Sequence, residues 1–267
     1  MLPSFRVLCV FLCLVMALGL AAAASSAATT PSVSAAPPVI VIGFVGGYVR
    51  HDDLVHSEVQ LAAHLLQDFP SGVMVKMFEN HRGEKAHEEI LRLLDTDQDG
   101  QLSTQEKQSA RIIIYGHSWG ASETLNLARE LEKDGIPVLL TIQVDSIAKG
   151  GQNDEVVPSN VGQAANFYQA DGLLHGRAKI RSADPEHTRI IGNFRSDYKA
   201  HPIRCDRYPW FSRVFMKTHI EIECDPNVWN QVDSLIRSNL PAPDGNGSSP
   251  RIDTVNSPLA ISDRHNR

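Results

Sequence analysis

Residues 111–120 contain a turn that few folds can accommodate. A β-type run over residues 111–115 leads directly into the pentapeptide GHSWG at 116–120, and a helix-forming stretch follows. A strand-to-helix turn this tight forces Ser118 into strained backbone angles, so small residues are needed where strand and helix nearly touch. Gly116 and Gly120 satisfy that demand. The pattern predicts that Ser118 projects from the carboxyl edge of a sheet as a nucleophile; the alternative is a purely structural turn.

The segments around this turn alternate between β-type and helical patterns. Strands are expected over residues 39–45, 72–78, 111–115, 136–144 and 188–194. Helices are expected over residues 56–67, 84–94, 122–133 and 225–237, the last capped by Asp225 with Pro226 in its first position. Runs of valine, isoleucine and leucine joined by helices predict an α/β fold with a mostly parallel sheet covered on both faces. Residues 156–169 begin like a capped helix at a pocket rim.

Length and charge narrow the class of protein. The chain has 267 residues, and without its two tails roughly 200 remain, which suits one domain. The net charge of −6 comes with scattered lysines and arginines, and no basic stripe with interleaved aromatic residues occurs. Nucleic acid is therefore not an expected partner.

The N-terminal residues predict export. Arg6 precedes an apolar run over residues 7–20, and small residues that suit a signal peptidase follow at 21–27. We expect a signal peptide at 1–24 and a periplasmic or extracellular protein without a stable membrane span. Because residues 7–24 are only just long enough to cross a bilayer, an uncleaved anchor is the alternative. A flexible linker at 25–38, one domain at 39–240 and a disordered tail at 241–267 complete the expected organisation.

Two cysteines remain once the leader has been removed. Cys9 and Cys13 lie within the apolar leader, which leaves Cys205 and Cys224 in the mature chain. Two cysteines in an exported protein suggest one disulfide, and two unpaired thiols are the alternative.

The elbow and its setting resemble the α/β-hydrolase family in a compact lipase-like form, over about residues 39–238. The resemblance implies a Ser-His-Asp triad in which the acid and then the histidine follow the nucleophile along the chain. Asp145 ends the strand after the elbow helix, so parallel geometry places it on the same sheet edge as Ser118. Asp145 is the favoured acid, and Asp154 and Asp197 are its rivals.

The general base should follow the last strand. His219 fits best, in a loop just before the final helix and between the two cysteines, with His201 and then His187 as alternatives. The oxyanion hole needs two N–H donors. Trp119 should supply one, and the glycine-rich loop at 43–47 the other, through Phe44 or Val45. An isoleucine, Ile42, stands where the family usually has a histidine. Phe44, Tyr48 and Trp119 are expected to give the site an apolar mouth.

Residues 95–106 match an EF-hand calcium loop at every diagnostic position. The loop has aspartate at positions 1, 3 and 5, glycine at 6, an apolar residue at 8, serine at 9 and glutamate at 12. Hard oxygen ligands at this spacing select Ca²⁺, and a solvated acidic turn is the alternative. The expected ligands are Asp95, Asp97, Asp99, Gln101 (through its carbonyl), Ser103 and Glu106.

Calcium is expected to have a structural role. The loop precedes the elbow strand and so lies toward its amino end, roughly 16 Å from Ser118. The sequence as a whole predicts an exported, calcium-binding serine hydrolase that acts on small-molecule or lipid carboxylic esters. Amide or thioester cleavage and acyl transfer are alternatives, as is a non-catalytic calcium-binding protein on a hydrolase scaffold.

Overall fold

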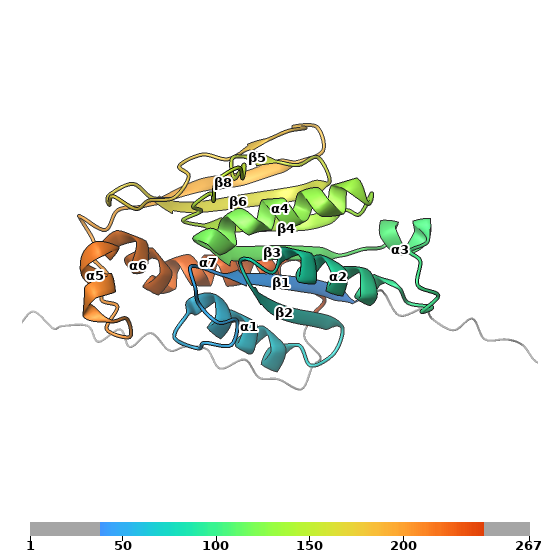
Figure 1. The fold of residues 1–267 in the computed structure, drawn as a ribbon, viewed down its shortest axis with the longest axis horizontal. Helices are drawn as coiled ribbons and strands as arrows, with labels where there is room; N and C mark the ends of the chain where they lie inside the picture. Colours follow the sequence, from blue (N-terminus) through green and yellow to red (C-terminus); the bar gives the residue numbers. More distant parts are fainter. Residues whose placement is uncertain (1–37, 243–267) are drawn as a thin grey trace, which may run out of the picture. The chain divides into compact units, whose positions relative to one another are not determined.

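The computed structural model describes residues 38–242, and the predicted signal peptide, nearly all of the linker and most of the tail lie outside them. The domain is built on a six-stranded sheet in which every pairing is parallel, in the order β2-β1-β3-β4-β6-β8 (Figure 1). The strands are β1 (Val39–Val45), β2 (Val73–Glu79), β3 (Ile112–His117), β4 (Val138–Val144), β6 (Val161–Gln169) and β8 (Arg189–Ser196). Two short strands, β5 (Val156–Val157) and β7 (Arg181–Ser182), form a second small sheet.

Helices cover both faces of the large sheet, because its strands are apolar on both sides. In β1, Val39 and Val41 belong to one core cluster, whereas Ile40, Ile42 and Phe44 belong to the other. Helices α1 (Ser57–Asp68) and α7 (Pro226–Arg237) pack on the first face, and α2 (Gly83–Leu94) and α4 (Trp119–Lys133) pack on the second (Figure 1). The short helices are α3 (Thr104–Gln108), α5 (Trp210–Phe215) and α6 (Lys217–Cys224).

The predicted fold class, an α/β fold with a mostly parallel sheet and helices on both faces, is confirmed. Asp225 caps α7 as expected, since its side chain accepts a hydrogen bond from the Asn227 amide. Within residues 38–242 no helix combines the length and the apolar character needed to cross a membrane.

The expected helix at residues 156–169 is wrong. These residues form β5 and β6, and β6 lies in the sheet between β4 and β8. Glycine, alanine, glutamine and asparagine occupy residues 162–166, so the middle of the strand lacks the usual β-branched signal. Ala164 and Ala165 are nevertheless fully buried between the helical layers, and tertiary packing decides their conformation.

A disulfide joins Cys205 to Cys224. The two residues are 19 positions apart, and their Cα atoms lie 5.7 Å from each other, within the range that a disulfide can bridge. The bridge ties the segment after β8 to the last residue of α6.

We predict that replacing both Cys205 and Cys224 by alanine lowers the free energy of unfolding by about 3 kcal/mol, because the unfolded chain loses a closed loop. Urea unfolding of the oxidised wild-type protein and the double variant measures the difference. As a control, reductant should bring the wild type to the level of the variant and leave the variant unchanged. Equal stability of the oxidised wild type and the variant would contradict the prediction.

Candidate active site

Ser118 occupies a sharp turn between β3 and α4. Its φ of 58° and ψ of −123° lie outside the regions that most residues adopt. Strand and helix approach so closely that a Cβ at Gly116 would stand 2.5 Å from the carbonyl oxygen of Gly120. A Cβ at Gly120 would in turn collide with the carbonyl of Phe44 in β1. Both glycines are therefore required by packing, as the sequence pattern predicts.

The structure brings Ser118, His219 and Asp145 into one hydrogen-bonded chain. The Nε2 atom of His219 lies 2.9 Å from the Ser118 hydroxyl oxygen, and its Nδ1 atom lies 2.7 Å from the Oδ2 atom of Asp145. All three side chains are buried, Asp145 completely. An imidazole held in this way can take a proton from the serine through Nε2 while the carboxylate fixes its orientation through Nδ1.

Asp145 is held by several donors at the carboxyl end of β4. Its Oδ1 atom accepts hydrogen bonds from the amides of Gly176 (2.6 Å) and Gln169 (3.3 Å), and its Oδ2 atom accepts one from the Gln169 side chain (2.9 Å). A Cβ at Gly176 would stand 2.5 Å from the Asp145 backbone, so glycine is needed there. Sequence reasoning missed Gln169 because it placed 156–169 in a helix. As the last residue of a strand parallel to β4, Gln169 lies on the same sheet edge as Asp145.

The alternative acids and bases lie in other settings. The carboxylate of Asp154 accepts hydrogen bonds from the Ser146 hydroxyl (2.9 Å) and from the Arg177 side chain (3.0 Å). The Asp197 carboxylate accepts bonds from the two following loop amides, at residues 199 and 200. His187 is exposed and pairs with Asp184, and His201 is also exposed.

The expected loop position of His219 is wrong, because the residue lies in the first turn of α6. The neighbouring residues Ile220 and Ile222 are buried, and that packing fixes the helix. Cys224 ends the same helix, so the disulfide anchors the element that carries the imidazole.

The loop after β1 lies beside the serine. A Cβ at Gly46 would stand 3.0 Å from the Cβ of Ser118. The amide of Gly46 donates to the Oε1 atom of Glu58 (3.3 Å) and so is already engaged. Trp119 is the first residue of α4, where backbone N–H groups have no partner within the helix.

The predicted apolar mouth needs one correction. The Phe44 side chain is fully buried in the core, and its ring centroid lies 6.2 Å from that of Phe78. Tyr48, by contrast, is 95 % exposed and lies edge-on against the Trp119 ring at 5.4 Å. These two rings form the aromatic part of the rim.

A second buried group of polar residues adjoins the candidate triad. The ring of His117 stacks on that of His219 with 4.7 Å between centroids, and its Nδ1 atom lies 3.5 Å from the Oε2 atom of Glu223. Burial lowers the pKa of His117 to about 4, which favours a neutral ring at pH 7 beside the His219 imidazole. Burial, reinforced by the charge of Glu223, raises the pKa of Glu58 to about 8. Sequence reasoning missed this group, although Glu223 follows His219 by one helical turn.

The predicted calcium loop lies at the other end of the sheet from Ser118, between α2 and α3 (Figure 1). The carboxylates of Asp95, Asp97 and Asp99 come within 4.8 Å of one another. Gly100 has a φ of 81°, which favours glycine, and its amide donates to the Oδ2 atom of Asp95 (3.0 Å). The Oδ1 atom of Asp95 is buried without a hydrogen-bond partner, which is the arrangement that a cation would satisfy.

The remaining predicted ligands are not in this group. The Glu106 carboxylate accepts hydrogen bonds from Thr96 and from Ser103, with which it forms a capping box at the start of α3. These bonds lower the pKa of Glu106 to about 2, so its side chain is charged. Gln101 is exposed on the same loop. The donor set fits Ca²⁺ if the Glu106 side chain turns toward the aspartates.

The chain has distant similarity to known proteins. No protein-family model matches the chain, and no curated protein matches its sequence. It is similar to a candidate hydrolase of the α/β superfamily from Xanthomonas campestris (11 % identity, TM-score 0.36, 75 % of this chain and 99 % of that one). It is also similar to an acetylxylan esterase (11 % identity, TM-score 0.37, 77 % of this chain and 99 % of that one). A third similar structure is human thioesterase 2 (10 % identity, TM-score 0.34, 71 % of this chain and 99 % of that one).

We predict that Asp145→Asn slows the reaction of Ser118 with a fluorophosphonate by on the order of 10³-fold or more, because the imidazole loses the group that orients it and stabilises its protonated form. Labelling rates measured by mass spectrometry test this. Asp154→Asn is the matched control, since it removes another buried carboxylate from the following loop and should leave the rate within a few-fold of wild type. If both substitutions slowed labelling equally, the effect of Asp145→Asn would not be specific, and Asp145 would not be assigned to the triad.

Proposed function

We propose that the protein is an exported serine hydrolase that cleaves carboxylic esters. The hydrogen-bonded chain from Asp145 through His219 to Ser118 carries this proposal. These side chains come from three separate elements and meet at a serine with strained backbone angles, an arrangement typical of nucleophilic catalysis. The N-terminal pattern of residues 1–27 supports export.

In the proposed mechanism, the Ser118 oxygen attacks the acyl carbon of the ester while Nε2 of His219 takes the hydroxyl proton. The Asp145 carboxylate stabilises the imidazolium that forms. Backbone N–H groups of Trp119 and of the last residues of β1, Phe44 or Val45, stabilise the negative oxygen. His219 then gives its proton to the departing alcohol. Water, deprotonated by the same imidazole, releases the acid from Ser118.

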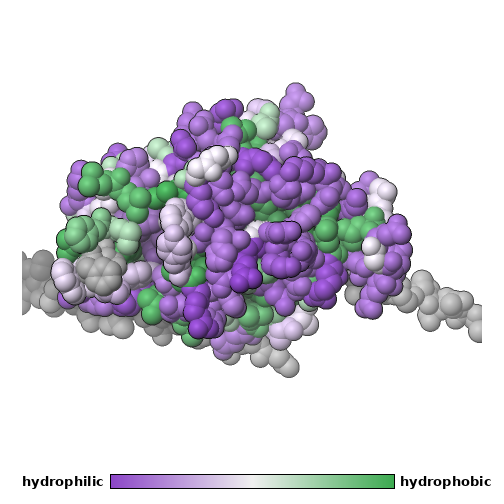
Figure 2. Space-filling model, viewed as in Figure 1, coloured by the Kyte–Doolittle hydropathy of each residue, from purple (hydrophilic) through white to green (hydrophobic). Residues whose placement is uncertain are grey.

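The surface near the proposed site supports an apolar acyl group in the substrate. Tyr48 and Trp119 lie at the rim. Exposed apolar side chains also occur on α5, which precedes the helix of His219, and on the loop after β6 (Figure 2). They are Leu173, Trp210, Val214 and Phe215. Apolar surface of this kind favours contact with a hydrocarbon chain.

We also propose that the loop at 95–106 binds Ca²⁺ and stabilises the crossover from α2 into β3. The grouping of Asp95, Asp97 and Asp99 and the unpartnered oxygen of Asp95 support this. The ion would have no part in catalysis, because β3 runs from the loop at its amino end to Ser118 beyond its carboxyl end.

Replacing Ser118 by alanine should reduce hydrolysis of p-nitrophenyl esters by at least about 10⁴-fold, because no other group can form the acyl-enzyme. Initial rates with short and medium acyl chains measure the loss. Ser159→Ala, a change at an exposed serine, is the control and should keep full activity. A folded wild-type protein whose Ser118 neither turns over esters nor reacts with fluorophosphonate would instead be a non-catalytic scaffold.

Chelation of Ca²⁺ should lower the melting temperature of the wild-type protein, because an ion that binds only the folded state stabilises it. A hundredfold excess of Ca²⁺ over its dissociation constant corresponds to about 2.7 kcal/mol. The shift is measured by thermal unfolding with and without EGTA. Asp97→Asn should abolish it. An unchanged melting temperature of the wild type on chelation would contradict calcium binding.

A further inference from the structure

His56, Glu58 and Glu223 form a buried cluster on the far side of His117 from the catalytic imidazole. His56 is the N-cap of α1, Glu58 lies in the first turn of that helix, and Glu223 lies near the end of α6. Their exposed fractions are 8 %, 0 % and 2 %. One nitrogen or oxygen atom from each residue lies within 4.8 Å of those of the other two. Neither the triad nor the oxyanion hole uses these side chains.

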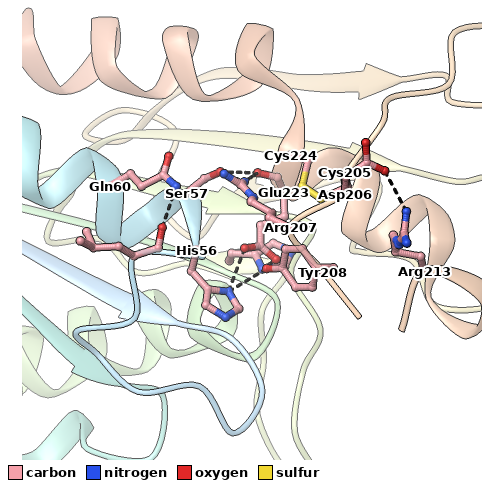
Figure 3. Close-up of a disulfide and its surroundings, with 12 residues drawn as sticks. His56, Ser57, Gln60, Cys205, Asp206, Arg207, Tyr208, Arg213, Glu223 and Cys224 are labelled. Carbon is pink, nitrogen blue, oxygen red and sulfur yellow. Dashed lines mark hydrogen bonds and ion pairs between the residues drawn. A yellow bond between two sulfur atoms is a disulfide. The ribbon is translucent and has the colours of Figure 1, made fainter. Parts of the chain in front are cut away.

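The contacts inside the cluster are short and specific. The Nδ1 atom of His56 lies 2.9 Å from the Oε1 atom of Glu223, and the Tyr208 hydroxyl lies 2.7 Å from the same nitrogen (Figure 3). The other ring nitrogen of His56, Nε2, faces the Asp53 carboxylate at 4.0 Å.

In the part of the chain that the structure describes, the carboxylates of Glu58 and Glu223 are not paired with a lysine or an arginine. Among residues 38–242, no lysine or arginine forms an ion pair with Glu58 or Glu223. Arg207 lies nearby but donates to the Ser57 hydroxyl and to the backbone carbonyl of Glu223. The imidazole of His56 is the cationic group that pairs with Glu223, at 2.9 Å, and burial raises the pKa of Glu58 to about 8, so that Glu58 keeps a proton that a metal ion would replace.

One oxygen of the cluster has no partner. The Oε1 atom of Glu58 accepts the Gly46 amide, whereas its Oε2 atom is buried without any hydrogen bond. A buried carboxylate oxygen left unsatisfied is rare and calls for a ligand or an ion.

We propose that His56, Glu58 and Glu223 bind a divalent transition-metal ion, with Zn²⁺ as the best match. The imidazole nitrogen disfavours calcium and magnesium, which prefer all-oxygen ligands, and the two carboxylates suit zinc. Ligand atoms of a four-coordinate zinc ion stand roughly 3.4 Å apart, so the atoms here need to move only slightly.

The proposed site is structural, because it is closed to water and lies outside the triad. A metal ion here would join the start of α1 to the end of α6. Glu58 also holds the loop beside Ser118 through the Gly46 amide, and α6 carries His219. One ion would therefore fix the oxyanion loop and the catalytic imidazole relative to each other.

The test is the metal content and thermal stability of the full-length protein, both independent of esterase activity. The protein is incubated with excess Zn²⁺ in millimolar Ca²⁺, which saturates the loop at 95–106, and is then freed of unbound metal. We expect about one zinc per chain by elemental mass spectrometry, as a closed three- or four-ligand site requires. At a hundredfold excess over the dissociation constant, zinc should raise the melting temperature by about 5–10 °C.

Glu58→Gln keeps the shape of the side chain but should lose both the zinc and the melting shift. Glu221→Gln is the matched control, since it changes a buried glutamate of α6, the helix of Glu223, that pairs with Lys217 outside the cluster. It should retain both. If Glu58→Gln does not fold, His56→Gln takes its place. Absence of bound zinc, cobalt or manganese in the wild type, or equal zinc in the wild type and Glu58→Gln, overturns the proposal.

Discussion

The contact between the start of α4 and the end of β1 is the constraint on which the arrangement at Ser118 depends. Gly120 approaches the Phe44 carbonyl so closely that no side chain fits between them. This contact sets the height of the helix over the sheet and forces Ser118 into its positive φ. Asp145, at the end of the neighbouring strand, also has a positive φ, of 45°. Both side chains reach one sheet edge because parallel strands end together.

Much of the fold and part of the candidate site could be predicted from local pattern. The run from Ile112 to Tyr115 predicts a buried strand, and the glycines at 116 and 120 predict the turn that follows. The parallel arrangement of the strands was enough to place Asp145 at the same edge of the sheet as Ser118. The segment 161–169 was missed because its small and amide side chains carry no strand signal, and burial between β4 and β8 decides its conformation. The contact of Gln169 with Asp145 was missed for the same reason.

The cluster of His56, Glu58 and Glu223 was beyond sequence reasoning for a different reason. Its most distant members, His56 and Glu223, lie 167 positions apart in the sequence, at the start of α1 and near the end of α6. Each residue alone looks like an ordinary polar residue at a helix end. Only the packing of α6 against the α1 end of the domain brings them together and removes water from them. By contrast, the loop at 95–106 is a contiguous pattern, so its aspartates were found directly.

The bridge between Cys205 and Cys224 encloses the residues from which His219 projects. Thiols join only in an oxidising compartment. Packing and the hydrogen bonds of His219 and Glu223 also hold α6, and the disulfide adds a covalent restraint on its position. Under the proposed function, joining these two thiols would restrict where His219 can lie relative to Ser118, and would so link the redox state of the compartment to the placement of the proposed base.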